Sequence, residues 1–231
     1  MRKILLLMLT IIFSVSVLFA QTKMNTNLRT ATFTGSVSGY GFIPATDPYL
    51  GTITVNDGLP ATMVDWVLVE LRATIGGATI AQAVGCLLED GSVTDTTGTN
   101  GLAFTGLESS TSYYVVVKHR NHLAVMSNAA VSIDEPDSFD ALEHDFTVSG
   151  AAYGGDGFGE KLVGSDYAMF ASDGDGNGFI QTTDKNSTWT TQVGQVGYKA
   201  ADFDMNGFVQ TTDKSAYYEN NVGKATQVPA Q

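Results

Sequence analysis

The sequence predicts a mainly β protein in which an antiparallel β-sandwich precedes a small C-terminal module of two loop–helix repeats. The first observation is a series of short runs rich in β-branched and aromatic residues, from Thr30 to about Val148, separated by clusters of glycine, asparagine and aspartate. The second is a pair of acidic windows, DGDGNGFIQTTDK from Asp173 and DFDMNGFVQTTDK from Asp202, which match at ten of thirteen positions and start 29 residues apart. A glycine-rich stretch separates the two parts.

Residues 1–20 have the pattern of a secretory signal peptide. A short basic start with Arg2 and Lys3 leads into an apolar run that ends in small residues, with Ala20 as the expected cleavage position. A membrane anchor is the alternative, because the apolar run is about as long as a spanning helix requires. No basic stop-transfer cluster follows the run, which favours the signal peptide, and we therefore expect the protein to be exported.

The composition of the chain is acidic. The formal net charge is −12, and removal of Arg2 and Lys3 with the signal peptide changes it to −14. This charge repels phosphate backbones and argues against nucleic acid as a partner, whereas it suits an exported protein that collects cations. The single cysteine, Cys86, lies in an apolar setting, so we expect a buried thiol and no internal disulfide.

We expect the β-sandwich to span residues 28–149. In the run DWVLVELR, Val67, Val69 and Leu71 would line one face of a strand, and no helical periodicity of any length appears in this half of the chain. Seven or so short strands with turn signals at this spacing are typical of a sandwich. The segments expected to form strands include 30–37, 50–57, 63–74, 102–107, 112–120 and 144–150.

A glycine-rich linker is expected over residues 150–161, and the second module over residues 162–228. The similarity of the two repeats in this module extends beyond the acidic windows, because Trp189 falls opposite Tyr218 and each repeat ends in a Val-Gly pair. Each repeat is therefore an acidic loop, a short segment with one aromatic residue at the matched position, and a Val-Gly terminator.

The first acidic window fills every position of a twelve-residue calcium-binding loop. Such a loop offers oxygen ligands at positions 1, 3, 5, 7, 9 and 12, with glycine at position 6 for a sharp turn. When the count starts at Asp173, position 6 is Gly178 and position 8 is the apolar Ile180. The expected ligands are Asp173, Asp175, Asn177, the carbonyl of Phe179, Gln181 and Asp184.

The second window obeys the same count, with Gly207 at position 6 and Val209 at position 8. We expect Val209 and its counterpart Ile180 to pair the two loops through a short β-bridge. The threonine pairs at 182–183 and 211–212 are expected to cap short helices. The expected ligands of the second loop are Asp202, Asp204, Asn206, the carbonyl of Phe208, Gln210 and Asp213.

The chemistry of the two loops favours two calcium ions. A single such loop could be a cluster of residues that favour turns, but two complete loops in tandem make that account weaker. Magnesium requires a tighter octahedral geometry and fits less well. Each loop carries three carboxylates and closes with aspartate rather than glutamate, so we expect a dissociation constant above roughly 10⁻⁵ M, in the range of extracellular modules. Repulsion between the carboxylates should leave the module partly unfolded without calcium.

The paired loops resemble dockerin type I repeats, on the windows DGDGNGFIQTTD and DFDMNGFVQTTD. The resemblance implies two calcium-loaded loop–helix units with near-twofold symmetry that bind a cohesin domain, with recognition at Thr182–Thr183 and Thr211–Thr212. The chain departs from this family between Asp184 and Asp202, where seventeen residues are fewer than usual. The segments after the loops also lack the Leu-rich, Lys/Arg-bearing helix faces that dock cohesin.

The architecture is more similar to that of exported proteins of Bacteroidota, in which a dockerin-like C-terminal module follows a β-sandwich. The segments that carry this resemblance are Asp65–Arg72 and Tyr113–Ser127. The run GLAFTGLESSTSYYVVV also looks like carboxypeptidase-regulatory or transthyretin-like modules. The resemblance implies an immunoglobulin-like or prealbumin-like sandwich, and a cell-surface or secreted location.

No catalytic motif stands out in the sequence. The patterns G-x-S-x-G and H-E-x-x-H and a phosphate-binding glycine loop are absent, so we expect a protein that is not an enzyme. His119 and His122 are three residues apart, and on one strand they would point to opposite faces and could not share a metal. His144 stands alone.

We therefore expect an exported, non-catalytic calcium-binding protein whose dockerin-like module mediates attachment or assembly at the cell surface or in an extracellular complex. The expected partner is a cohesin-like domain or a surface scaffold. The alternative is a carbohydrate-binding accessory protein of a polysaccharide-degrading assembly, in which Trp66, Tyr113 and Tyr114 form an exposed row that stacks on glycan. The same three residues would also suit packing between strands.

Overall fold

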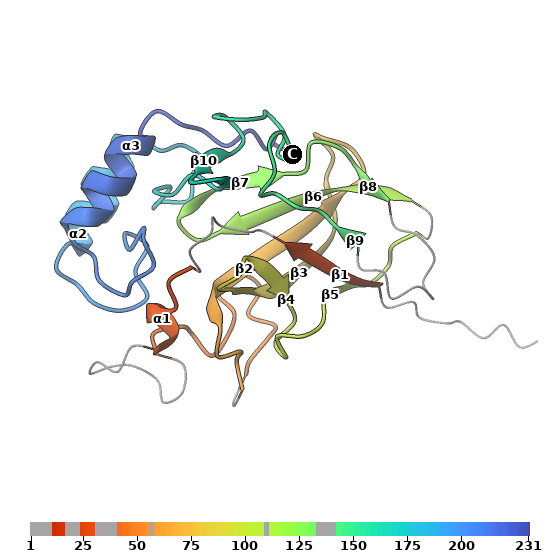
Figure 1. Ribbon diagram of the computed structural model, residues 1–231, viewed down its shortest axis with the longest axis horizontal. Helices are drawn as coiled ribbons and strands as arrows, with labels where there is room; N and C mark the ends of the chain where they lie inside the picture. Colours follow the sequence, from red (N-terminus) through yellow and green to blue (C-terminus); the bar gives the residue numbers. More distant parts are fainter. Residues whose placement is uncertain (1–10, 17–23, 31–40, 56–57, 109–110, 133–141) are drawn as a thin grey trace, which may run out of the picture.

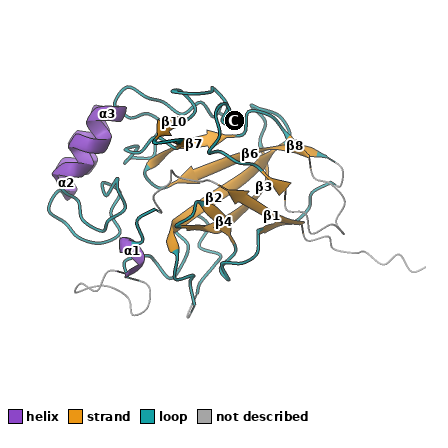
Figure 2. Cartoon of the chain, in the orientation of Figure 1, coloured by secondary structure: helices purple, strands orange, loops and turns teal. Residues whose placement is uncertain are grey.

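The predicted fold class is confirmed: the described part of the chain is mainly antiparallel β-structure, with a sandwich and a small helical module (Figure 2). The helical segments of the C-terminal module lie at one end of the molecule, away from β8 and β9 (Figure 1). The computed structural model describes residues 11–16, 24–30, 41–55, 58–108, 111–132 and 142–231.

The secondary structure consists of short strands followed by two helical repeats. The strands are β1 (Ile11–Ser16), β2 (Met63–Arg72), β3 (Thr79–Leu88), β4 (Ser92–Thr94), β5 (Leu102–Phe104), β6 (Ser112–His119), β7 (His122–Met126), β8 (Val131–Ser132), β9 (Leu142–Glu143), β10 (Lys161–Val163) and β11 (Asp166–Ala168). The helical segments are α1 (Asn27–Thr30), the π-helical η1 (Asp184–Trp189), α2 (Thr190–Gln192), the π-helical η2 (Asp213–Tyr218) and α3 (Glu219–Asn221).

The main sheet has the strand order β5-β1-β4-β3-β2-β6-β7, with β8 beside β6 and β9 beside β1. Its centre is β2, whose ten residues are all buried and which pairs with β3 on one side and β6 on the other. The sheet curls into two layers, since β5 lies against β3 although β1 and β4 stand between them in the strand order. A Cβ atom at Gly85 of β3 would meet Cδ2 of Leu102 of β5 at 2.9 Å. This close approach of β5 over β3 makes the curled sheet a sandwich with its core between the layers.

Four segments differ from the sequence-based expectation or extend beyond it. The strand predicted over 144–150 is wrong: this segment forms a turn in which Asp145 accepts hydrogen bonds from the backbone and hydroxyl of Thr147. The strand predicted over 50–57 is reduced to a bridge at Thr54, and residues 56–57 lie outside the described residues, as does most of the strand predicted over 30–37. Strand β3 was not expected, because its alanines, glycine and glutamine favour strands weakly, but it pairs with β2 at nine positions.

Strand β1 lies within the predicted signal peptide. It pairs antiparallel with β4 and β5 and parallel with β9. Among the described residues, no helix has both the length and the apolar character needed to cross a membrane. The signal peptide and its cleavage after Ala20 stay a prediction.

The aromatic residues proposed to contact glycan belong mostly to the core. Trp66 is fully buried and donates its indole N–H to the carbonyl of Pro44 at 3.0 Å, and Tyr113 is also buried. The exposed row of the carbohydrate-binding alternative is therefore wrong, since only Tyr114 of the three is partly exposed, whereas the packing role that was also considered is confirmed for Trp66 and Tyr113. Cys86 is buried as predicted, and burial raises the pKa of its thiol to about 12. These side chains stabilise the sandwich by removing apolar area from water.

The glycine-rich segment over residues 150–161 is hydrogen-bonded to the end of β7. The backbone N–H of Tyr153 donates to the carbonyl of Met126 at 2.7 Å. The buried carboxylate of Glu160 accepts hydrogen bonds from the backbone N–H groups of Gly150 at 2.8 Å and Ala152 at 3.1 Å. The segment therefore packs on the sandwich, while the predicted module boundaries on either side of it stay a prediction.

Candidate metal centre

Two clusters of carboxylates lie in the C-terminal module, each within one acidic loop. In each cluster the candidate ligand oxygens of three aspartates lie within 4.8 Å of one another. Oxygens on opposite sides of a calcium ion lie about 4.6–5.2 Å apart, because each bond is about 2.3–2.6 Å long. Each all-oxygen cluster therefore fits one hard cation. The clusters are Asp173, Asp175 and Asp184 in the first loop, and Asp202, Asp204 and Asp213 in the second.

The first residue of the first loop organises the turn that brings the ligands together. The two carboxylate oxygens of Asp173 accept hydrogen bonds from the backbone N–H groups of Asn177 and Gly178, both at 3.0 Å. Gly178 has φ of +83°, a left-handed conformation that side chains disfavour. The glycine at position 6 is therefore required by the backbone, as the sequence predicts.

The last residue of the first loop joins the loop to its helix. One oxygen of Asp184 accepts hydrogen bonds from the N–H groups of Gly174 at 2.7 Å and Asp175 at 3.2 Å, and the other accepts one from Gln181 at 2.8 Å. The helix begins at residue 182, so this carboxylate reaches back across the first turn as in a capping box. The expected capping by Thr182–Thr183 is therefore wrong, because these residues lie inside the helix and Thr183 makes no side-chain cap.

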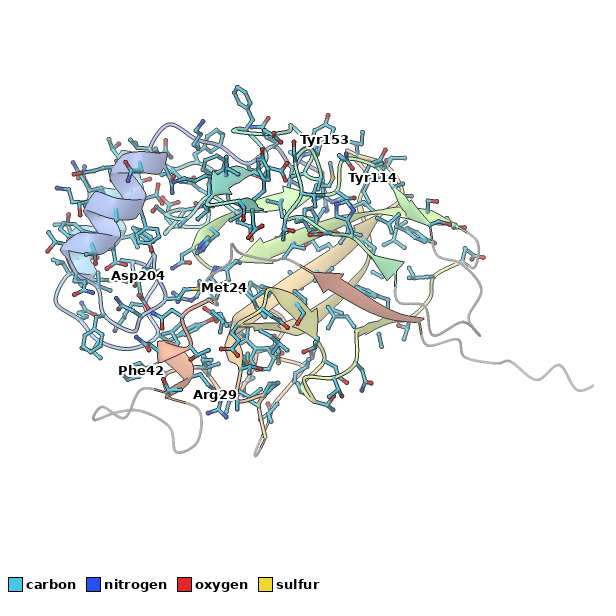
Figure 3. All side chains as sticks on the ribbon, in the orientation of Figure 1. Met24, Arg29, Phe42, Tyr114, Tyr153 and Asp204 are labelled. Atoms are coloured by element: carbon cyan, nitrogen blue, oxygen red, sulfur yellow. The ribbon has the colours of Figure 1, made fainter. Side chains whose placement is uncertain are left out.

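The second loop repeats this geometry position by position. Its first aspartate binds the N–H groups of positions 5 and 6, at 3.0 and 2.9 Å, and Gly207 at position 6 has φ of +87°. Its last aspartate binds the N–H groups of positions 2, 3 and 9, at 2.7, 3.3 and 2.8 Å. Figure 3 shows Asp204, at position 3, on the loop beside the helical segments. Two sequences that match at most positions have folded into one local structure.

The remaining predicted ligands, at positions 5, 7 and 9, take part in hydrogen bonds within their own loops. The amide oxygen of Asn177 accepts a hydrogen bond from Phe179 N–H at 2.9 Å, and that of Asn206 accepts one from Phe208 N–H at 2.8 Å. The glutamines at position 9, Gln181 and Gln210, donate their backbone N–H groups to the closing aspartates and are exposed.

The electrostatics of the clusters favour the binding of a cation. Burial, assisted by neighbouring carboxylates, raises the pKa of Asp173 to about 6, from an ordinary value of 3.8. Burial raises the pKa of Asp213 to about 6, with Asp204 adding to the effect. Burial also raises the pKa of Asp202, although Arg120 opposes the shift. Ionised carboxylates in these positions are destabilised by each other and by lost hydration, and a bound cation would relieve both effects.

The residues at position 8 do not pair the loops with each other, so that expectation is wrong. Ile180 instead exchanges hydrogen bonds with the segment after the second helix, through Gly223 N–H and the carbonyl of Lys224, both at 2.8 Å. Val209 does the same with the segment after the first helix, through Gly194 N–H at 2.8 Å and the carbonyl of Gln195 at 2.9 Å. Each loop is therefore connected to the Val-Gly terminator of the other repeat, and this crosswise pairing is the structural use of the repeated Val-Gly.

The turn between β6 and β7 connects the sandwich to both loops, and its participation was not predicted. The carbonyl of Asn121 accepts hydrogen bonds from Ser172 N–H at 2.9 Å and from Asp173 N–H at 3.1 Å. The amide of the same residue donates to the carbonyls of Ala200 at 3.1 Å and Asp202 at 2.8 Å. One fully buried side chain and its backbone thus hold the first residue of each loop. The sequence HRNH was visible, but only the tertiary structure shows what it contacts.

The histidines of this turn lie closer together than expected. His119 ends β6 and His122 begins β7, and the turn between them brings their Nδ1 atoms to 2.9 Å. The expectation that they point to opposite faces of one strand is wrong, because they lie on two strands. Burial, with nearby His119 and Arg120, holds the pKa of His122 well below its usual value.

The turn between β6 and β7 contains one partner of a buried ion pair, Arg120, and the other partner is Asp65 of β2. The carboxylate of Asp65 accepts hydrogen bonds from Arg120 Nε at 2.8 Å, His119 Nε2 at 3.1 Å, the hydroxyl of Tyr198 at 2.7 Å and the backbone N–H of Trp66 at 2.7 Å. Burial acts to raise the pKa of this carboxyl, but the Arg120 guanidinium, His119 and the Tyr198 hydroxyl together outweigh burial and hold the pKa well below its usual range. Sandwich and module therefore share a polar network at their junction.

Comparison with known proteins adds little to this geometry. No protein-family model matches the sequence, and no curated protein matches it. Among solved structures, the chain aligns with a type II Cohesin-X-Dockerin complex from Acetivibrio cellulolyticus, an N-terminal interface mutant, with 14% identity and a TM-score of 0.42. The alignment covers 93% of this chain and 97% of that chain. At this identity and TM-score the likeness carries no argument.

The fold and the site define the class on their own. The chain is a mainly β protein with a C-terminal pair of acidic loop–helix repeats, and each repeat holds a carboxylate cluster that fits one metal ion.

Proposed function

We propose that the C-terminal module binds two calcium ions, one in each acidic loop. The observation that supports this most is the repeated hydrogen-bond pattern, in which the first and last aspartates of both loops bind equivalent backbone N–H groups. This pattern turns three carboxylates per loop toward one point, within 4.8 Å. Calcium prefers such flexible, all-oxygen surroundings.

The ion would link the loop to the helix that follows it. Asp173 and Asp202 would hold it from the start of each loop, and Asp184 and Asp213 from the first helical turn. Because the sites form only in the folded module, the free energy of binding adds to the free energy of folding. Calcium would thus be a structural ion, and the protein would not be an enzyme.

The module would serve attachment or assembly with a protein partner. Thr182 and Thr183, at the start of the first helix, are exposed, and so are Thr211 and Thr212 at the start of the second. The two helical segments η1 and η2 contact each other, so the two threonine pairs belong to one small helical unit. A partner of the cohesin or scaffold kind is proposed to recognise this polar, hydroxyl-bearing surface, which calcium would keep in shape.

A calcium titration of the full chain by calorimetry tests the metal sites. We expect uptake of two ions and, at calcium concentrations about 100-fold above the dissociation constant, a stabilisation of about 2.7 kcal/mol for each site. The matched double variant Asp175→Ala/Asp204→Ala removes one carboxylate from each loop and should lose this uptake. Position 3 is chosen because its carboxylates support fewer backbone N–H groups than those of positions 1 and 12. Absence of heat and of stabilisation at millimolar calcium would refute the proposal.

The proposed location outside the cell is tested by the mass of the protein recovered from its natural export pathway. We expect a mature chain that begins at Gln21, after Ala20. Removal of residues 1–20 would take β1 away from β4, β5 and β9. Recovery of a full-length chain from the cell interior alone would contradict export.

A further inference from the structure

The two loops have the same predicted ligands but different surroundings. Asp175 and Asn177 of the first loop are exposed, whereas the equivalent Asp204 and Asn206 of the second loop are partly buried. Gly178 of the first loop faces Thr226 near the C-terminus. The second loop instead packs on the sandwich side, since Met205 belongs to the sandwich core.

Phe42 also makes the surroundings of the second loop differ from those of the first. A Cβ atom at Gly207 of the second loop would meet the ring of Phe42 at 3.1 Å. Figure 3 places Phe42 near α1, on the side of the molecule where Asp204 lies. The second loop therefore lies at the junction between sandwich and module, while the first loop faces solvent at these positions.

A fixed positive charge accompanies the second loop. The side chain of Arg120 is 90% buried, and its Nη2 atom lies 3.9 Å from Oδ2 of Asp202, the first ligand position. This buried Nη2 atom has no hydrogen-bond partner within the described part of the chain. Nε of the same guanidinium binds Asp65, Nη1 binds the carbonyl of Lys199, and the ring of Tyr198 lies 4.3 Å from its centre. The guanidinium cannot turn away without breaking these contacts.

We propose that Arg120 is a positioning residue that makes the two calcium sites unequal. It acts as a built-in counter-ion for Asp202, so the second loop has less net negative charge than the first and binds calcium more weakly. The inference rests on the proposed calcium binding and adds a division of roles to it. The first loop is the tighter site, and the second is a junction site that is partly neutralised by the sandwich.

The sign of the effect follows from the charges. Both loops carry three carboxylates, and among the described residues only the second has a cation this close to a first-position aspartate. A divalent ion near a guanidinium is repelled, and the repulsion is large where water is excluded. Asp65 offsets part of the charge, but it lies against Nε, whereas Nη2 is the atom nearest Asp202. We expect the second site to bind calcium about tenfold more weakly than the first. This difference is a small part of the energy with which an unscreened guanidinium would repel a calcium ion at such a short distance.

Single-site variants of the full chain test the inequality without altering Arg120. Asp204→Ala leaves the first site and Asp175→Ala leaves the second, and both substitutions fall at position 3 of a loop. Calcium dissociation constants are measured by competition with a chelating dye. We expect the value of the Asp175→Ala protein to be about tenfold higher than that of the Asp204→Ala protein.

A second pair of variants tests whether Arg120 is the cause. Replacement of Arg120 alone would leave Asp65 buried without its partner, so the charge pair is removed together as Asp65→Asn/Arg120→Gln. In the Asp175→Ala background this change should tighten calcium binding at the second site about tenfold. In the Asp204→Ala background the double change should leave the first site unchanged. Arg120→Lys keeps the positive charge, so in the Asp175→Ala background it should keep the second site weak.

The outcomes are distinguishable. No calcium uptake by the unaltered protein would defeat the proposed function itself. Two sites of equal affinity, or a second site tighter than the first, would overturn the inference and leave calcium binding intact. A weak second site that does not respond to loss of the Asp65–Arg120 pair would also overturn it, because the weakness would then come from burial of the loop.

Discussion

Replacement of Asp65 by alanine is expected to destabilise the protein by about 3–5 kcal/mol, because it leaves the Arg120 guanidinium buried without its partner. Asp65 is fully buried in β2, and its two oxygens accept hydrogen bonds from groups of both modules. The loss therefore affects the sandwich and its junction with the C-terminal module together. Urea unfolding of the full chain, followed by circular dichroism, measures it.

Asp90→Ala is the matched control for this substitution. Asp90 is exposed and accepts hydrogen bonds from the backbone N–H and hydroxyl of Ser92 in a turn. Surface changes of this kind usually alter stability by about 0.5 kcal/mol, and loss of a turn hydrogen bond by about 1 kcal/mol. If the two variants lose the same stability, the buried network at Asp65 contributes no more than an ordinary turn.

The stability of the protein in the presence of a chelator is expected to fall as the pH rises from 5 to 8. The pKa values of Asp173 and Asp213 are raised from 3.8 to about 6 in the folded protein, so these groups bind protons more tightly when folded. Their contribution is fully present below pH 3.8 and is lost as the pH rises through about 6. We expect a total loss on the order of 1–3 kcal/mol.

Calcium should abolish this loss, because a bound ion stabilises the ionised carboxylates in place of protons. Calcium binding below about pH 7 should accordingly release protons, and calorimetry in two buffers of different ionisation enthalpy counts them. Buried His122 has a lowered pKa, so its contribution to the stability of the protein is lost as the pH falls. This pH dependence is opposite in sign to that of the two aspartates. The comparison of chelator with calcium at each pH cancels that contribution. Parallel pH profiles with and without calcium would contradict the assignment of the carboxylates as ligands.

Local chemistry explains why the two loops could be predicted so closely. The hydrogen bonds accepted by the aspartate carboxylates of each loop run between residues at most ten positions apart, as between Gly174 and Asp184, and a glycine supplies the left-handed turn. Such contacts depend on the order of residues within a dozen positions and need no distant partner. Strands β2 and β6 were predicted for a similar reason, since their β-branched residues favour extended chain.

Long-range contacts account for what was missed. Strand β3 has a weak intrinsic preference and is held by its pairing with β2. Trp66 is buried in the core of the sandwich, where its indole N–H reaches the carbonyl of Pro44, 22 positions away. The turn at 119–122 gains its role only when the module folds against it. The position-8 residues pair with the Val-Gly terminator of the opposite repeat and the residue after it.

The sequence by itself therefore determined the mainly β class and the two acidic loops with their ordered carboxylates, because these depend on propensity and on contacts close along the chain. The tertiary structure alone decided the crosswise connection of the repeats, the hydrogen bonds of Asn121 to the first residue of each loop and the approach of Arg120 to Asp202. Those contacts join residues that are separated along the chain, by 15 positions between Gly194 and Val209 and by 81 positions between Asn121 and Asp202, and no local pattern encodes which distant groups will meet.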